Sequence, residues 1–460
     1  MAGKYTFKRD LYTDVIHSMS NSRATFLLGA RKCGKTVCLK QIKDEYENAE
    51  YIDFKEKTDK EKSEVFLQIQ KSIENDENKV YLLDEITYAI NPEINICILA
   101  GLFSEYDTKN VRIVFAGSQS LALERWGHIA FGGSAGYVRP DFLSYAEWLR
   151  YKQISEPSAE SYEHFLYGAM EFYGFTSMQE YLQGCIDETI ISNAKTSNYI
   201  YGNDCNLLDV DVLLDICYAT LFTLRNYVTS SIFMKNNVLK DDIGAYFAKV
   251  CAELDLDARI SDSFFSRYNS FERKDLKVLE QAFLFLRNCD LITVTPVVNN
   301  LDNIPDLEQE FTLIAHGEKP RISFKDDLFR DFNVCIKYPV FYVAILKDIF
   351  KEQMPAHLPH GLLGSIMECQ TRGLLSGKGA VEYRDLSGNE VDYVNVIDHT
   401  AVEITIANKS LKEMHFDCLP DDYKCCLLTK DKTDVVQKIQ LIPYYDFINN
   451  GADWRKTDGR

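Results

Sequence analysis

The sequence predicts an α/β fold with a mostly parallel sheet in the N-terminal part of the chain. Apolar runs at residues 25–28, 79–83 and 111–116 have the composition of buried strands. The segments between them carry apolar residues at helical spacing. Strands that alternate with helices in this way predict right-handed crossovers and a parallel sheet. At 460 residues the chain is too long for one core, so further domains are expected.

The expected elements of this first part follow one another closely. In chain order they are a strand at 25–28, a helix from 37, a strand at 50–54, a helix at 62–73, a strand at 79–83, a helix at 94–106 and a strand at 111–116. Ser144 and Glu147 have the spacing of a capping box, so a helix is expected to begin there. The glycine-rich stretch 127–136 is expected to be a mobile loop.

A phosphate-binding pattern, GxxxxGKT, lies between the first strand and the first helix. Its residues, with the one that follows, are Gly29, Ala30, Arg31, Lys32, Cys33, Gly34, Lys35, Thr36 and Val37. A strand that leads through a glycine loop into a helix directs backbone N–H groups and the positive end of the helix dipole at one point. Lys35 is expected to reach the β- and γ-phosphates of a nucleotide, and the Thr36 hydroxyl to bind Mg²⁺. The alternative is a chance match in an ordinary strand-turn-helix segment.

Two acids end the apolar run 79–83, about fifty residues after the glycine loop. The carboxyl end of a buried parallel strand reaches a ligand crevice. Asp84 is therefore placed to hold Mg²⁺, and Glu85 to orient or deprotonate the attacking water. After the strand 111–116, Ser118 or Gln119 is expected near the γ-phosphate as a polar sensor. A turn or a helix cap is the alternative for these two residues.

Residues 23–150 resemble the ATPase domain of prokaryotic AAA-type ATPases that carry an active or degenerate nuclease-like domain at the C terminus. The glycine loop, residues 82–85, residues 116–123 and residues 139–148 lie in the order of that family. The resemblance implies a P-loop NTPase domain over residues 1–150 and Mg²⁺-dependent ATP hydrolysis. It also implies an arginine that completes the site, from the same or a neighbouring subunit. Arg139 and Arg125 are the candidates, and a surface salt bridge is the alternative for each.

The middle of the chain is expected to contain two parts. Residues 151–236 have apolar residues at helical spacing and predict a helical lid on the ATPase core. Residues 237–310 show three helical patterns and a β-ribbon that starts at 291, which resembles the winged helix of the same family. Its functional interpretation is DNA binding, and its alternative is interdomain packing. Residues 270–279 have too little basic excess to identify a DNA-binding face.

Residues 311–460 are expected to form a second α/β domain. A helix at 362–374 precedes strands at 381–384, 390–396 and 401–406, and further strands are expected at 424–429 and 439–443. This order resembles the PD-(D/E)xK nuclease fold, in which three acids gather a divalent metal and a lysine helps to activate water. The positions that correspond to these four residues are Glu368, Asp392, Glu403 and Thr405.

The lysine position of that motif is therefore Thr405, and threonine supplies neither a cation nor a proton-transfer group. The resemblance thus implies a degenerate nuclease-like domain. Lys409 and Lys412 follow closely and are the candidates to replace the missing lysine. Without them, the carboxylates are a remnant scaffold, a weak metal site or a docking surface.

Composition limits the partners. A net charge of −18 argues against a surface devoted to nucleic-acid phosphates, although a local basic patch stays open. No apolar run approaches the roughly 20 residues of a membrane span, and the first residues lack the apolar region of a signal peptide. A cytoplasmic protein without a membrane partner is expected. The thirteen cysteines form no CxxC pair and are expected to be reduced thiols.

Three functions are compatible with these observations. The first is an ATP-hydrolysing, Mg²⁺-dependent switch or motor that repositions the other domains. The second is a DNA nuclease gated by ATP, in defence against foreign DNA. The third is an ATP-bound interaction scaffold with negligible turnover. A homo-oligomer and a DNA or protein partner are compatible with each of them.

Overall fold

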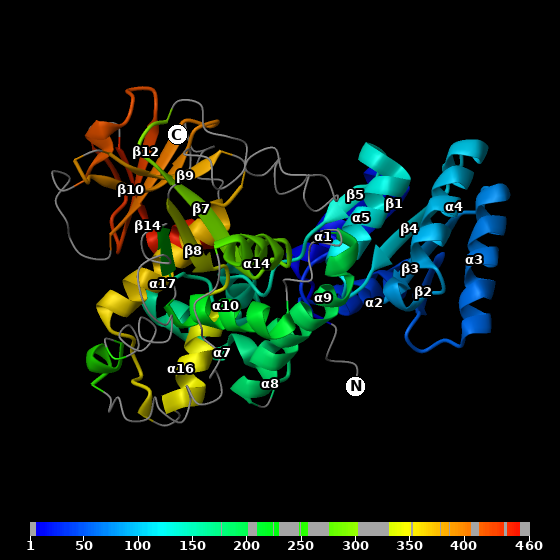
Figure 1. Cartoon of the computed structure of the whole chain (residues 1–460), viewed down its shortest axis with the longest axis horizontal. Coiled ribbons are helices and arrows are strands. Elements are labelled where there is room, and N and C mark those ends of the chain that lie inside the picture. The colour runs from blue at the N-terminus through cyan, green and yellow to red at the C-terminus, as the bar shows by residue number, and fades with distance from the viewer. Residues whose placement is uncertain are drawn as a thin grey trace. The chain divides into compact units, whose positions relative to one another are not determined.

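The computed structural model of the chain describes residues 6–175, 177–200, 209–223, 225–229, 248, 250–255, 276–301, 331–350, 353–377, 379–385, 387–405, 414–436 and 439–450. Tertiary contacts divide the chain into two units (Figure 1). The first comprises Met1–Leu143, Gly184–Asn206 and Leu313–Lys319. The second comprises Ser144–Gln183, Leu207–Thr312 and Pro320–Arg460. The chain therefore leaves the first unit and returns to it.

The first unit contains a five-stranded sheet of order β2-β3-β4-β1-β5, and every strand pair in it is parallel. Its strands are β1 (Ala24–Leu27), β2 (Ala49–Asp53), β3 (Lys79–Asp84), β4 (Val111–Ala116) and β5 (Gly136–Val138). The predicted parallel α/β sheet is confirmed. In this order β4 lies between β1, which leads into the glycine loop, and β3, which leads into Asp84.

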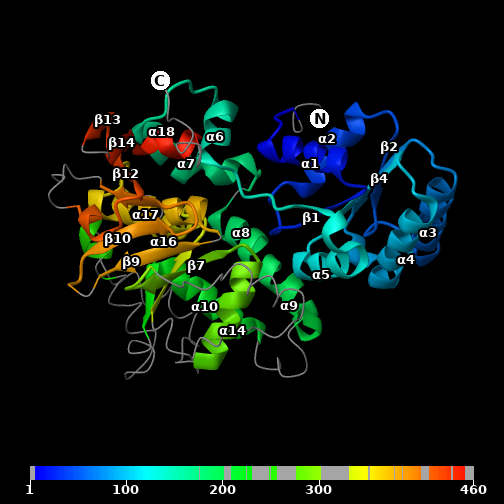
Figure 2. The same ribbon diagram turned by 90° about the horizontal axis from the view of Figure 1, so that it is seen from above.

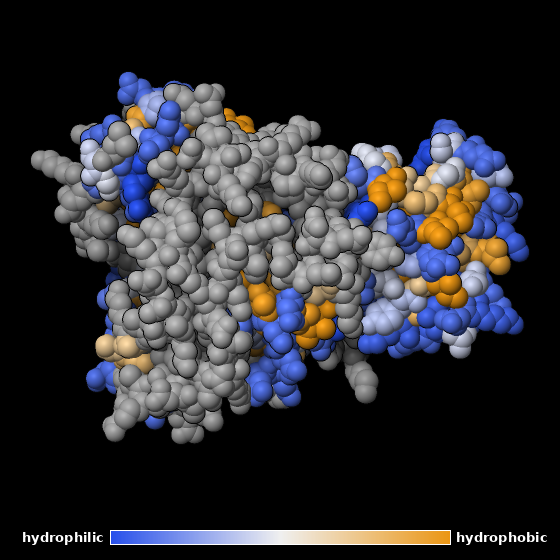
Figure 3. Space-filling view, viewed as in Figure 1, coloured by the Kyte–Doolittle hydropathy of each residue, from blue (hydrophilic) through white to orange (hydrophobic). Residues whose placement is uncertain are grey.

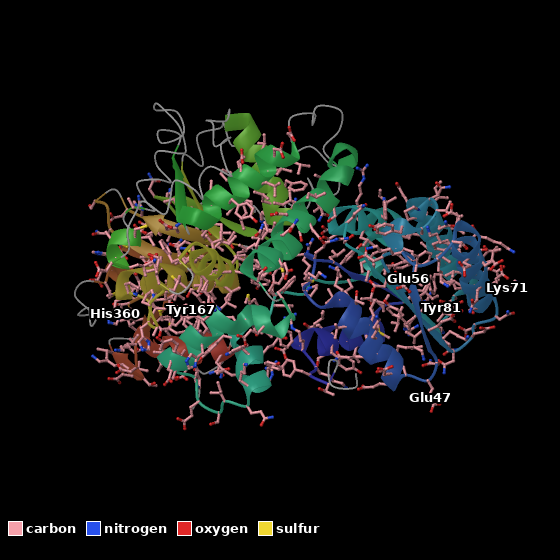
Figure 4. The ribbon with its side chains drawn as sticks, turned by 90° about the horizontal axis from the view of Figure 1, so that it is seen from below. Glu47, Glu56, Lys71, Tyr81, Tyr167 and His360 are labelled. Atoms are coloured by element: carbon pink, nitrogen blue, oxygen red, sulfur yellow. The ribbon has the colours of Figure 1, made fainter. Side chains whose placement is uncertain are left out.

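Helices cover both faces of this sheet, as Figure 2 shows. They are α1 (Asp10–Asn21) and α2 (Lys35–Glu45) on one face, and α3 (Asp59–Glu74), α4 (Pro92–Tyr106) and α5 (Ser120–Phe131) on the other. Because side chains alternate along a strand, Val80 and Leu82 join the core under α1 and α2, whereas Tyr81 and Leu83 join the core under α3 and α4. The Tyr81 hydroxyl also lies 2.7 Å from the Ser72 hydroxyl of α3 (Figure 4).

Helix α4 is apolar on two sides. Ile96, Leu99 and Phe103 are buried against the sheet. Ile94 and Ile98 lie on the outer side with 60% and 43% of their surface exposed. Apolar atoms gather over this part of the unit in Figure 3.

The glycine-rich stretch 127–136 differs from the prediction of a mobile loop. It contains the end of α5, a 3-10 turn at Gly132–Ser134 and the start of β5. Two of its glycines are required by packing. A Cβ on Gly127 would lie 2.9 Å from the Phe26 ring, and a Cβ on Gly136 would lie 2.1 Å from the Ser18 hydroxyl. These glycines therefore allow a helix and a strand to pack closely, which the composition alone does not distinguish from a flexible loop.

The second unit contains a nine-stranded mixed sheet of order β13-β14-β12-β11-β10-β9-β7-β8-β6. Its strands are β6 (Arg225–Thr229), β7 (Ile292–Val298), β8 (Asp331–Ile336), β9 (Ala380–Arg384), β10 (Glu390–Asn395), β11 (Thr400–Ile404), β12 (Lys424–Thr429), β13 (Asp434–Val436) and β14 (Ile439–Pro443). Its helices include α6 (Tyr145–Lys152), α7 (Ala159–Phe172), α8 (Met178–Leu182), α10 (Val210–Thr223), α14 (Leu276–Asn288), α16 (Val340–Phe350), α17 (His360–Leu375) and α18 (Tyr444–Asn450).

Most of the expected elements of this unit are present. The capping box at Ser144 and Glu147 starts α6, with both reciprocal hydrogen bonds formed. Helix α17 precedes β9, β10 and β11 as expected, and β12 and β14 continue the sheet in parallel. The strand expected from 291 is β7, but it joins the nine-stranded sheet through both β8 and β9.

Residues 225–229 contradict the expectation of a purely helical region from 151 to 236. They form β6, which pairs antiparallel with β8. The run contains Tyr227, Val228 and Thr229, which favour strands, so tertiary pairing agrees with local preference. Residues 241–247 and 256–275, in which two helices of the expected winged helix fall, lie outside the described residues, as do Lys409 and Lys412. The division into four domains stays a prediction.

Two general features of the described residues bear on the expectations from composition. None of the helices among them combines the length and apolar character that crossing a bilayer requires. No disulfide joins the cysteines in the described ranges, which are all free thiols.

Candidate nucleotide-binding site

The glycine loop between β1 and α2 contains two glycines whose backbone conformation other residues rarely adopt. Gly29 has a φ of 110° and Gly34 a φ of 102°, both in the left-handed region. A Cβ at Gly29 would also come within 3.2 Å of Pro140. Gly34 directly precedes α2, so the loop ends at the positive end of the helix dipole. The loop thus has the backbone of a phosphate-binding turn.

Lys35 is folded back onto this loop. Its ammonium donates hydrogen bonds to the carbonyl oxygens of Gly29 at 2.8 Å and of Ala30 at 2.7 Å. Only 8% of the residue is exposed. The ammonium also lies 3.6 Å from the Cys33 Sγ atom. The hydrogen-bond partners of this buried cation are therefore neutral groups, which compensate a full charge only in part. An anion that approaches the loop would therefore find a lysine ready to exchange partners. Thr36, the next residue, is exposed.

Asp84 is buried at the end of β3, with 2% exposure. One of its carboxylate oxygens accepts a hydrogen bond from the Tyr51 hydroxyl at 2.9 Å, and the other accepts one from the Glu85 backbone N–H at 3.1 Å. Asp53 stands opposite Asp84 in the register of β2 and β3. Burial raises the pKa of Asp53, and the nearby carboxylates of Asp84 and Glu85 add to the rise. Burial and Asp84 likewise raise the pKa of the Tyr51 hydroxyl.

Glu85 is held by the residue that follows the neighbouring strand. Its carboxylate oxygen Oε2 accepts hydrogen bonds from the Ser118 backbone N–H at 3.2 Å and from the Ser118 hydroxyl at 3.0 Å. Glu85 itself has a φ of 50°, in the left-handed region. Ser118 is buried, whereas Gln119 precedes α5 without a capping hydrogen bond from its side chain. The structure thus brings Ser118 to Glu85.

Helix α9 (Glu188–Ile200) also reaches the site, and sequence reasoning missed it. The Thr189 hydroxyl accepts a hydrogen bond from the Arg31 backbone N–H at 2.8 Å, and the Arg31 side chain pairs with Glu188. The signal in the sequence is a row of small polar residues, Thr189, Ser192 and Asn193, at the spacing of one helix face. Sequence reasoning also missed Tyr51, for which an isolated tyrosine in a strand gives no signal.

Arg9 is a further residue at the loop that sequence reasoning missed. Its guanidinium donates to the Cys33 carbonyl oxygen at 2.6 Å and to the Asp141 carbonyl oxygen at 3.0 Å. It therefore ties the segment before α1 to the glycine loop. One arginine near the start of a chain carries no pattern that would have predicted this contact.

The two candidates for a site-completing arginine lie in or beside α5 and β5. Arg139 forms an ion pair with Glu124 of α5 at 2.5 Å, and 40% of its side chain is exposed. Arg125 is half-buried in α5. The observed ion pair corresponds to the salt-bridge alternative for Arg139. A role of Arg139 in catalysis stays a prediction.

One acid of the expected nuclease-like site, Asp392, lies near a buried arginine in the second unit. Arg372 of α17 has 1% of its side chain exposed, and its Nη1 lies 2.6 Å from Oε2 of the fully buried Glu382. Its Nη2 lies 3.7 Å from Oδ1 of Asp392, whose other oxygen accepts the Ile404 N–H at 3.0 Å. The Asn333 amide donates to the same Glu382 oxygen at 2.7 Å. We call Arg372, Glu382, Asp392 and Asn333 the buried charge cluster.

This cluster places a protein cation where the sequence suggested a metal. Burial alone would lower the pKa of Arg372, but Glu382 and Asp392 outweigh it and raise that pKa. Among the described residues no three His, Cys, Asp or Glu side chains are arranged to hold a metal ion, so Glu368, Asp392 and Glu403 do not form such a group. Thr405 is buried and donates its N–H to the Leu428 carbonyl oxygen at 2.9 Å. The nuclease-like identity of this unit stays a prediction.

Comparison with known families identifies the class of the first unit. Residues 21–149 match the model of a family described as an AAA domain. This part of the chain is therefore similar to an AAA domain, which agrees with the resemblance of its motifs to AAA-type P-loop ATPases. The match covers well under half of the chain, and the residues of the expected lid, winged helix and nuclease-like domain lie beyond it.

Several solved structures share a distant likeness. The Walker-type ATPase paby2304 of Pyrococcus abyssi has 14% identity and a TM-score of 0.38, with 74% of this chain and 96% of that chain covered. Cdc6p of Pyrobaculum aerophilum has 12% identity and a TM-score of 0.24, with 75% and 94% covered. AMPPCP-bound DnaA of Aquifex aeolicus has 14% identity and a TM-score of 0.27, with 60% and 94% covered. With TM-scores this low, the likenesses say nothing about what this protein does. No curated protein matches the chain at a significant level.

Proposed function

We propose that the protein binds ATP with Mg²⁺ and hydrolyses it, and that this turnover drives a conformational change in the chain. The observation that carries the proposal is the meeting of three chain segments at the carboxyl edge of one parallel sheet. β1 leads into the loop with Lys35, β3 leads into Asp84 and Glu85, and β4 between them leads into Ser118. Ligands bind at this edge of open α/β sheets.

The loop and Lys35 would bind the phosphates. Backbone N–H groups at the start of α2 favour negative charge, and the Lys35 ammonium would leave the carbonyls of Gly29 and Ala30 for phosphate oxygens. A charge-assisted hydrogen bond of this kind contributes about 1.5–3 kcal/mol. The neutral carbonyl oxygens would lose a partner that the phosphate binds more strongly.

The oxygen donors at the site fit Mg²⁺. The exposed Thr36 hydroxyl and the buried Asp84 carboxylate are hard oxygen ligands of the kind that Mg²⁺ prefers, and Thr36 directly follows the phosphate-binding Lys35. Tyr51 and the Glu85 N–H fix the orientation of Asp84 by hydrogen bonds. When bound, the ion would neutralise charge on the β- and γ-phosphate oxygens.

Glu85 would orient the attacking water and accept its proton. Ser118 fixes one oxygen of the Glu85 carboxylate with two hydrogen bonds, and this sets the direction of the other. An arginine, Arg139 or Arg125, would then stabilise charge at the γ-phosphate, from the same chain or from a second copy in a homo-oligomer. For Arg139 this requires release from Glu124.

A test separates binding from turnover. Glu85→Gln should leave the Kd for a fluorescent ATP analogue within about threefold of the wild type but lower phosphate release at least about 100-fold, because the amide cannot accept the proton. Glu105→Gln, at an exposed position of α4, is the matched control and should turn over as the wild type does. Unchanged hydrolysis by Glu85→Gln would remove Glu85 from this role. Absence of nucleotide binding by the wild type would end the proposal itself.

For the second unit we propose a structural rather than a hydrolytic role for the buried charge cluster. Support comes from Arg372, which supplies a fixed positive charge to Glu382 and Asp392. A partner such as DNA or another protein, a cytoplasmic location and the helical lid remain proposals. The alternative, an ATP-gated nuclease, would need a metal to bind among these carboxylates.

A further inference from the structure

Helix α9 contacts two segments of the proposed ATPase site. Its residues Glu188 and Thr189 contact Arg31 in the glycine loop. One turn later, Ser192 and Asn193 contact the segment that follows β4. Glu188 to Asn193 belong to the first unit, although α8, which precedes them in the chain, belongs to the second.

Asn193 has no exposed surface, and its amide is used at both ends. The Oδ1 atom accepts a hydrogen bond from the Leu121 backbone N–H at 3.2 Å. The Nδ2 atom donates to the Ser118 carbonyl oxygen at 3.3 Å and to the Thr189 carbonyl oxygen at 2.9 Å. Since a backbone N–H only donates and a carbonyl only accepts, these partners fix which end of the amide is which.

The segment that Asn193 holds is the one that holds Glu85. Ser118 and Leu121 bracket the turn between β4 and α5, and Ser118 donates both its N–H and its hydroxyl to the Glu85 carboxylate. The Ser192 hydroxyl is a second donor near the Ser118 carbonyl oxygen, at 3.2 Å, and shares its one proton with the Thr189 carbonyl oxygen at 3.1 Å. The direction of the Glu85 carboxylate is therefore set through one residue, Ser118, whose carbonyl is bound by α9.

The same turn is also connected to the loop. The Ser120 hydroxyl donates to the Gly29 carbonyl oxygen at 3.3 Å, the same oxygen that accepts a bond from the Lys35 ammonium. Thr189, on the face of α9 that carries Asn193, accepts the Arg31 N–H. A buried polar network whose members are all hydrogen-bonded is rigid. Displacing the residues at one end of this network would therefore move the residues at the other end.

We propose that α9 is the element that couples the glycine loop to Glu85, with Asn193 and Thr189 as positioning residues. The inference rests on the proposed ATPase function and extends it to the control of turnover. Nucleotide entering the loop would move Arg31 and Lys35, and α9 would transmit that movement to the Ser118 turn. The chain enters α9 from the π-helical stretch Gln183–Asp187, which joins the two units in sequence, and π-helical turns frequently lie at functional sites.

The test compares turnover with binding. Asn193→Ala removes the bonds to Leu121 and Ser118 and should lower kcat about 10- to 100-fold, while the Kd for the fluorescent ATP analogue stays within about threefold. Ser192→Ala deletes only one donor to Ser118 and should lower kcat about two- to fivefold. Thr189→Val keeps the shape of the side chain but lacks the acceptor for Arg31, so it should raise the Kd more than it lowers kcat. Ile191→Ala, at a 38% exposed position of the same helix, is the control and should change neither constant.

The outcomes keep the two proposals apart. If the wild type releases no phosphate, the ATPase function fails. If the wild type turns over and Asn193→Ala matches it in kcat, the ATPase function stands and the role of α9 is wrong. Should Asn193→Ala fail to fold, Ser192→Ala carries the test, because loss of one hydroxyl leaves the helix intact. In the Glu85→Gln background, Asn193→Ala should cause no further loss of turnover, since the group it positions is gone; an additional loss would show an effect unrelated to Glu85.

Discussion

The glycine loop of the first unit and the buried charge cluster of the second each bury a cation, but they neutralise it differently. Lys35 lies on two carbonyl oxygens of its own loop, whereas Arg372 lies against Glu382 and near Asp392. Both cations are at least nine-tenths buried. A buried charge held by dipoles still attracts an anion, and one held by carboxylates does not. This difference is the basis for proposing a ligand site at the loop and a structural ion pair in the cluster.

The first test of this comparison removes Arg372. Arg372→Leu should lower the free energy of unfolding of the second unit by about 3–5 kcal/mol, because it leaves the Glu382 carboxylate buried without its cation. Hydrogen exchange of peptides from α17 and β9 measures this locally. Arg384→Leu is the matched control: Arg384 also lies near Glu382 but is 38% exposed, so about 1 kcal/mol or less is expected.

The Arg372→Leu/Glu382→Leu double variant should recover part of that loss, since neither charge is then left unpaired. If Arg372→Leu keeps the exchange protection of the wild type, the cluster does not hold the unit together. A carboxylate site open to metal would then become the better interpretation.

The second test removes Lys35. Lys35→Ala should weaken binding of the fluorescent ATP analogue about 100-fold, because the phosphates lose a charged partner in a buried place. The same variant should change the free energy of unfolding by less than about 1 kcal/mol, because its present partners are neutral carbonyls. Lys43→Ala, at an exposed position of α2, is the control. If Lys35→Ala bound nucleotide as the wild type does but had a clearly lower free energy of unfolding, Lys35 would have a structural role and not a ligand-binding one.

The third test removes divalent metal from the whole protein. Excess EDTA should reduce phosphate release to background, because the Thr36 and Asp84 oxygens would lose their Mg²⁺. It should leave hydrogen exchange in α17 and β9 unchanged, because Arg372 supplies the positive charge there. Loss of protection in those peptides on chelation would contradict the structural role of Arg372.

The two regions also differ in what the sequence could predict. The glycine loop, Asp84 and Glu85 are contiguous motifs, and local spacing was enough to predict the strands and helices that carry them. The roles of these residues stay predictions. The partners of those residues come from elsewhere: Thr189 and Asn193 lie about 70 residues after Ser118 and act only because α9 packs beside α5. For the buried charge cluster, the sequence predicted some of the acids but not the cation. Glu368, Asp392 and Glu403 were predicted as acids of one motif, but Arg372 belongs to no motif, and only the structure shows that it lies against Glu382 and near Asp392.

The smallest expected effect concerns a second charge pair of the same unit, in which 79% of the His357 side chain is exposed. His357 lies 2.7 Å from the Glu163 carboxylate of α7, and this hydrogen bond raises the pKa of His357 above its ordinary value of 6.5. Because the folded pKa is the higher one, the pair stabilises the unit fully below about pH 6.5 and loses this contribution as the pH rises through the raised pKa. The stability of His357→Gln should therefore depend less on pH across that window than that of the wild type, as measured by urea unfolding. His360→Gln, at the start of α17 (Figure 4), should keep the wild-type slope. If His357→Gln kept the wild-type slope as well, the His357–Glu163 pair would contribute nothing measurable to the free energy of unfolding. The contrast with the glycine loop would then rest on Arg372 alone.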